Sequence, residues 1–144
     1  KLLRRILAKG EHGVVLAGDP SQAAPASALE KNLRSDRLLN FTGRTSLLEL
    51  AAILKNAAAS VGPDSGPGHL SAAVGTPYVA LFGPTDPARV APFRCLPFVV
   101  QAENDCRGCY RKTCRHKGPN CMAEITADMV MGKLEQALAA GKLY

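Results

Sequence analysis

The chain has 144 residues, enough for one domain with a single hydrophobic core, and its 47% hydrophobic and 21% charged content is that of a globular protein. No apolar run approaches the roughly 18 residues of a membrane-spanning helix, and no signal peptide opens the sequence, so we expect a cytoplasmic protein. The 18 Lys and Arg against 12 Asp and Glu give a charge of +6, which favours either an anionic partner or a solvated basic surface.

The first forty residues alternate helical and extended patterns. Apolar residues recur at helical spacing over 2–7, and Gly10 ends this helix. Residues 14–17 form a short apolar run, which is typical of a parallel strand covered on both faces. A polar, alanine-rich segment follows, with a helix expected over 26–33 and an extended piece over 38–41.

The clearest helix follows a capping box. Ser46 and Glu49 have the spacing at which each side chain bonds to the other's backbone, and an apolar stripe continues to Leu54. A second core strand is expected over 57–62.

The rest of the chain continues this alternation. The turn over 64–69 precedes a short helix that Asp64 or Ser65 can cap. A third strand is expected over 78–82, and Thr126 begins the last helix. The pattern predicts an α/β domain with a parallel sheet, in which ligands bind at the carboxyl ends of the strands.

The loop over 62–69 carries the most chemical information. Gly66 and Gly68 have no Cβ, so a ligand can approach the backbone, and the start of the next helix offers N–H groups that suit a diphosphate. His69 lies in the first turn, within reach of an anionic oxygen. Two alternatives remain open, because such a turn is often purely structural and a lone His is often a core residue.

Several motifs are absent from the sequence. It contains no GxGxxG after the first strand, no GxxxxGK[ST] and no GxSxG, which disfavours dinucleotide oxidoreductases, P-loop NTPases and serine hydrolases. The few aromatic residues are scattered and do not alternate with basic ones, so a nucleic-acid partner is disfavoured.

Four runs of residues combine into a specific pattern. They cover 42–50, 62–73, 75–77 and 80–87 and read TGRTSLLEL, GPDSGPGHLSAA, GTP and ALFGPTDP. In this order and spacing they resemble the lipopolysaccharide heptosyltransferases of glycosyltransferase family 9. The resemblance implies a Rossmann-like parallel sheet flanked by helices, the C-terminal half of a GT-B glycosyltransferase that binds the nucleotide-sugar donor, typically ADP-heptose.

The resemblance also assigns roles to residues. Asp64, Ser65, Gly66 and His69 match the element that contacts the diphosphate and sugar of the donor, and Thr45 falls in the loop near the nucleoside. Asp19 follows the first strand, where related enzymes carry an acidic ribose contact.

The resemblance extends to the whole enzyme. It implies inverting transfer of heptose to an anionic glycolipid acceptor, the lipid A–core, with no required metal or other cofactor. The N-terminal domain, which supplies the catalytic base, and the first strand of this domain are expected to be absent. No catalytic residue is therefore assigned to this chain, and contact with the cytoplasmic face of the inner membrane is expected to be peripheral.

A cysteine cluster is interleaved with basic residues near the C-terminus. Cys106, Cys109, Cys114 and Cys121 are enough for a structural zinc site, although their spacing also fits free thiols or a disulfide. This cluster raises the alternative of a small zinc-bearing nucleic-acid-binding module. A sugar-nucleotide epimerase domain of the GT-B kind is the other alternative to a transferase.

Overall fold

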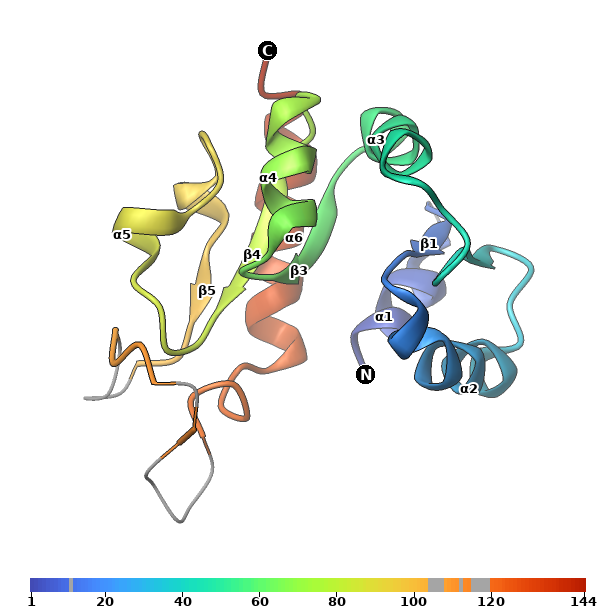
Figure 1. The fold of residues 1–144 in the computed structure, drawn as a ribbon. Coiled ribbons are helices and arrows are strands. Elements are labelled where there is room, and N and C mark those ends of the chain that lie inside the picture. Colours follow the sequence, from blue (N-terminus) through green and yellow to red (C-terminus); the bar gives the residue numbers. More distant parts are fainter. Residues whose placement is uncertain (11, 104–107, 112, 115–119) are drawn as a thin grey trace. The chain divides into compact units, whose positions relative to one another are not determined.

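The computed structural model describes residues 1–10, 12–103, 108–111, 113–114 and 120–144. These residues form two compact units, Lys1–Ala52 and Ile53–Tyr144. Each unit contains a parallel sheet with helices packed on it, so the predicted α/β class is confirmed (Figure 1). The expectation that the chain forms one domain stays a prediction.

Unit 1 is built on a two-stranded sheet. Its elements are α1 (Leu2–Lys9), β1 (Val14–Leu16), a 3-10 turn (Pro20–Gln22), α2 (Ala23–Leu33) and β2 (Leu38–Asn40). Gly10 ends α1 in a left-handed conformation with φ of 82°, as the sequence predicts. β1 and β2 run parallel, with Val14 opposite Leu38. α2 begins three residues earlier than expected, at the 3-10 turn.

The helix α3 (Leu47–Asn56) begins with the predicted capping box. The Ser46 N–H donates to Glu49 Oε2 over 2.7 Å, and the Glu49 N–H donates to Ser46 Oγ over 3.3 Å. Donation from the Ser46 backbone and hydroxyl lowers the pKa of Glu49. The strand expected over 57–62 begins only at Ser60, because the helix extends through Asn56 and the Ala57 N–H still donates to the Ile53 carbonyl.

Unit 2 contains a three-stranded parallel sheet in the order β3-β4-β5. Its elements are β3 (Ser60–Pro63), α4 (Gly66–Ala73), β4 (Tyr78–Phe82), α5 (Pro87–Val90), a 3-10 turn (Leu96–Phe98), β5 (Val100–Gln101) and α6 (Ala127–Ala140). α4 packs on β3 and β4 in front of the sheet in Figure 1, and α6 packs on β4 and β5 behind it. Thr126 caps α6 as predicted, with Oγ1 accepting from the Met129 N–H over 3.3 Å.

The central strand β4 forms the core of this unit. Val79, Ala80 and Phe82 have no solvent exposure. Because the three strands run parallel, the loops that follow Pro63, Phe82 and Gln101 leave the sheet at the same edge. Within the described residues, no helix is both long enough and apolar enough to cross a bilayer.

Candidate functional site

Asp64 connects two loops at the carboxyl edge of the unit 2 sheet. Its backbone N–H donates to the Leu81 carbonyl over 3.3 Å, and its Oδ2 accepts a hydrogen bond from Thr85 Oγ1 over 2.8 Å. Both side chains are half-buried. The loop after β3 is therefore held against the loop after β4, and the carboxylate of Asp64 has a fixed orientation.

Ser65 occupies the N-cap position of α4 without capping it. Its backbone is extended, with φ of −162°, and its hydroxyl donates to the Pro63 carbonyl over 3.1 Å. The expectation that Asp64 or Ser65 caps the helix is wrong, because both side chains bond elsewhere. The start of α4 consequently has no side-chain cap.

The two glycines at the start of α4 have different roles. A Cβ on Gly66 would meet nothing within 4 Å, so this side of the backbone is open. A Cβ on Gly68 would lie 2.5 Å from Tyr78 Cε1, and one on Gly62 would lie 2.3 Å from the Tyr78 hydroxyl. Gly68 thus makes room for an aromatic ring, whereas the sequence pattern predicts that it admits a ligand.

The side chain of Tyr78 supports the start of the loop that follows β3. Its hydroxyl donates to the Pro63 carbonyl over 2.7 Å, and its side chain is only 3% exposed. Burial raises the pKa of this phenol, which keeps it a neutral donor. Sequence reasoning assigned Tyr78 to a strand and missed this contact. The sequence feature that could have indicated it is a large aromatic residue at position 78 together with glycines at 62 and 68, which leave space for its ring.

His69 lies on the exposed side of α4, in its first turn. Its exposure removes the alternative of a buried core histidine. In the described part of the chain its side chain has no hydrogen-bond partner, so it is available to a ligand at the helix start.

Asp19 and Thr45 belong to unit 1, whereas the predicted residues Asp64, Ser65, Gly66 and His69 lie together in unit 2. Asp19 caps the 3-10 turn, with Oδ1 accepting from the Ser21 N–H over 2.8 Å. Its bonds with the Ser21 hydroxyl and then with the Ser21 N–H lower the pKa of this exposed carboxylate. Thr45 is half-buried and follows the loop in which the Gly43 N–H donates to the Gly18 carbonyl over 2.9 Å.

The cysteine cluster lies partly outside the described residues, because Cys106 is not among them. Cys109, Cys114 and Cys121 have free thiols, and no group of three potential metal ligands occurs among the described residues. The zinc alternative, which needs Cys106, stays a prediction.

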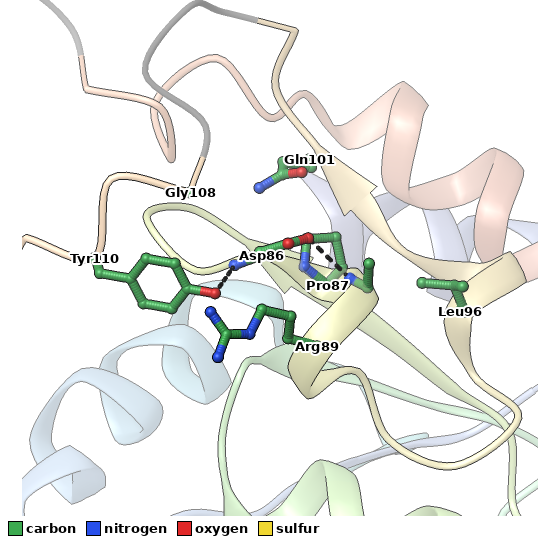
Figure 2. A pocket seen from close by; sticks show the side chains of 8 residues that line it. Asp86, Pro87, Arg89, Leu96, Gln101, Gly108 and Tyr110 are labelled. Atoms are coloured by element: carbon green, nitrogen blue, oxygen red, sulfur yellow. Dashed lines mark hydrogen bonds between the residues drawn. The ribbon is translucent and has the colours of Figure 1, made fainter.

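An open cavity of about 490 Å³ lies along the loop that follows β4. Figure 2 shows the side chains that line it, which include Asp86, Arg89, Leu96, Gln101 and Tyr110. The ALFGPTDP run over 80–87 includes this loop but none of the distant residues that support it. These residues come from segments with no periodic signal.

Comparison with known proteins assigns the family. The sequence model described as glycosyltransferase family 9 (heptosyltransferase) matches residues 1–119. This chain belongs to glycosyltransferase family 9. The identification confirms the resemblance inferred from residues 42–87, and nothing in the comparisons supports the epimerase or the nucleic-acid-binding alternative.

The relatives of this family 9 chain are longer than the chain itself. It is 31% identical over 105 residues to the lipopolysaccharide core heptosyltransferase OpsX of Haemophilus influenzae, covering 67% of this chain and 30% of the relative. It is also 31% identical to lipooligosaccharide heptosyltransferase 2 of the same organism, covering 96% of this chain and 41% of the relative. The chain thus spans less than half the length of these relatives.

A solved structure agrees with the predicted fold. The Escherichia coli heptosyltransferase WaaC with ADP has a TM-score of 0.71 and 24% identity to the chain, and the match covers 94% of this chain and 38% of WaaC. This likeness confirms the GT-B heptosyltransferase type of α/β fold.

Proposed function

We propose that this chain is the donor-binding part of an inverting heptosyltransferase that transfers heptose from ADP-heptose to the inner core of lipopolysaccharide. Family membership supports the reaction type, and the names of the relatives support the sugar and the acceptor class. The presence of ADP with WaaC supports the choice of nucleotide.

The observation that carries the proposal is the uncapped start of α4. The Gly66 N–H has no side-chain acceptor, and the space beside Gly66 is empty. Pro67 has no N–H, and the Gly68 N–H donates to the Ser65 carbonyl over 3.0 Å. An eight-residue helix also presents the positive end of its dipole here. The diphosphate of the donor would accept a hydrogen bond from the Gly66 N–H, with His69 donating from the exposed side.

The same residues would assist the departure of the nucleoside diphosphate. Negative charge develops on the diphosphate as the glycosidic bond to it breaks, and preoriented N–H donors stabilise that charge without a metal ion. The carboxylate of Asp64, oriented by the Thr85 hydrogen bond to Oδ2, would accept from a sugar hydroxyl through its other oxygen. Thr45 and Asp19 would contact the nucleoside and its ribose.

The acceptor would be the anionic lipid A–core, met at the cytoplasmic face of the inner membrane. The positive charge of the chain, +6, supports a peripheral contact with an anionic surface. The base that deprotonates the acceptor hydroxyl would come from an N-terminal domain outside these residues.

Calorimetry with ADP and AMP tests the donor role. We expect ADP to bind at least about tenfold more tightly, because only ADP offers a second phosphate to the start of α4. Chelation of divalent metals with EDTA should leave the preference unchanged. Equal affinities for the two nucleotides would show that the second phosphate does not bind at this loop.

Two glycine variants locate the effect. Gly66→Val fills the open space beside the helix start and should abolish the preference for ADP. Gly132→Val is the matched control, because Gly132 is also a helical glycine whose Cβ would meet nothing within 4 Å. If both variants keep the preference, the diphosphate does not bind at Gly66.

A further inference from the structure

The cavity along the loop after β4 is bounded by parts of the chain that are fixed against one another. The Tyr110 N–H donates to the Pro84 carbonyl over 2.8 Å, and the Tyr110 hydroxyl accepts from the Asp86 N–H over 3.3 Å. From β5, Gln101 Nε2 donates to the carbonyls of Gly83 and Thr85 over 3.2 and 3.1 Å. The walls of the cavity are therefore formed before any ligand binds.

Tyr110 is held in an unusual backbone conformation. Its φ of 54° lies in the left-handed region, which residues other than glycine seldom adopt. Despite two hydrogen bonds to the loop after β4, the side chain remains 49% exposed. The segment that carries Tyr110 thus presents the aromatic ring at the rim of the cavity (Figure 2).

Arg89 is the basic side chain among the described residues that line the cavity. Its guanidinium lies over the Tyr110 ring, 6.0 Å from the centroid, and its side chain is exposed. In the described part of the chain, it makes no ion pair. Among the described residues that line the cavity, the only acid is Asp86, and its Oδ1 accepts from the Ala88 N–H over 3.0 Å. A guanidinium so placed offers its N–H groups in the geometry that a carboxylate or phosphate accepts.

The combination fits a sugar better than a bare anion. The cavity of about 490 Å³ lies within the usual range for small-ligand sites. An exposed aromatic ring and Leu96, which is 54% exposed, offer apolar surface to the C–H groups of a sugar ring. Asp86, Gln101 and Arg89 supply hydrogen-bond donors and acceptors for the hydroxyls of a sugar.

We propose that this cavity is a subsite for an acidic sugar of the acceptor, in which Tyr110 packs on the ring and Arg89 binds its phosphate or carboxylate. The proposal rests on the proposed transferase function. Its position supports it, because Thr85 hydrogen-bonds to Asp64 in the donor loop and Asp86 is the next residue. An acceptor sugar at Asp86 would lie beside a donor sugar at Asp64.

The test is a titration of the 144-residue chain, followed by the NMR shifts of backbone amides. The probes are glucose 6-phosphate, glucuronate, glucose and inorganic phosphate. We expect the two acidic sugars to shift the amides of Arg89, Gln101 and Tyr110 and to bind about tenfold more tightly than glucose, through one charge-assisted pair. Inorganic phosphate should bind more weakly than glucose 6-phosphate, because it lacks the ring.

Variants separate the two contacts. Arg89→Gln should abolish the tenfold preference and leave glucose unchanged, whereas Tyr110→Leu should weaken all three sugars. Arg94→Gln is the matched control, because Arg94 is also exposed and lies over an aromatic ring, 5.4 Å from the Phe93 centroid, outside the cavity lining. It should bind all probes as the unmodified chain does.

The outcomes distinguish this proposal from the donor role. ADP, added to the same sample, is followed at the backbone amides of Ser65, Gly66, Gly68 and His69. If ADP shifts these amides but no sugar shifts those of the cavity, the subsite is refuted and the donor role stands. If the sugars shift the amides of the cavity but ADP shifts no amide of the donor loop, the donor role is refuted. A preference for acidic sugars that persists in Arg89→Gln, or phosphate binding equal to that of glucose 6-phosphate, refutes the acidic-sugar subsite.

Discussion

Substitution of Gly68 by alanine tests the packing beneath the proposed donor loop. The new Cβ would lie 2.5 Å from Tyr78 Cε1 and 2.9 Å from Cδ1. The ring cannot move aside easily, because it is buried and hydrogen-bonded to Pro63. Overpacking of this kind costs about 1–3 kcal/mol, while alanine gains up to about 1 kcal/mol over glycine in a helix.

Gly66→Ala is the matched substitution, because it lies in the same helical turn and its Cβ meets nothing. Both variants gain helix propensity, so their difference isolates the clash. We expect Gly68→Ala to be less stable than Gly66→Ala by about 1–3 kcal/mol. Urea unfolding followed by circular dichroism measures this difference.

The same two alanine variants, made in a chain that also carries Tyr78→Val, identify the cause of the stability difference. Tyr78→Val removes the ring, so the difference between the two alanine variants should fall below about 0.5 kcal/mol in that background. If Gly68→Ala is as stable as Gly66→Ala in the unmodified chain, the ring does not require a glycine there. If the difference persists without the ring, another contact is responsible.

Two further predictions concern the proposed reaction. His69→Ala should weaken ADP binding by about 1–3 kcal/mol in calorimetry, which is the range of a charge-assisted hydrogen bond. Its melting temperature should change little, because His69 is exposed. A large drop in melting temperature with unchanged ADP binding would assign His69 a structural role. The 144-residue chain alone should form no product from ADP-heptose and a glycolipid acceptor, since we place the base elsewhere; turnover that Asp64→Asn abolishes would instead place the base in this chain.

The elements predicted correctly from the sequence are those with a local physical signal. Gly10 ends α1, and Ser46 with Glu49 begins α3, because glycine conformation and capping act over a few residues. β4 was predicted at its observed bounds, since its apolar run is buried on both faces. In contrast, β5 is only two residues long, too short to show a period, and its position depends on pairing with Leu81 and Phe82.

The candidate site divides in the same way. The loop over 64–69 could be found from glycines that precede a helix. The contacts that give this loop its shape join residues that are 15 to 21 positions apart, Tyr78 with Pro63 and Thr85 with Asp64. No periodicity reports such pairs, because each depends on the distance between neighbouring strands.

The hydrogen bonds from Gln101 to the loop after β4, and from Thr85 to Asp64, have an entropic consequence. A loop that must become ordered around its ligand loses conformational freedom on binding, and that loss weakens affinity. Here three segments from different strands restrain one another in the unliganded chain. A ligand at Asp64 would therefore meet a carboxylate whose freedom was already lost on folding, and more of its interaction energy would appear as affinity.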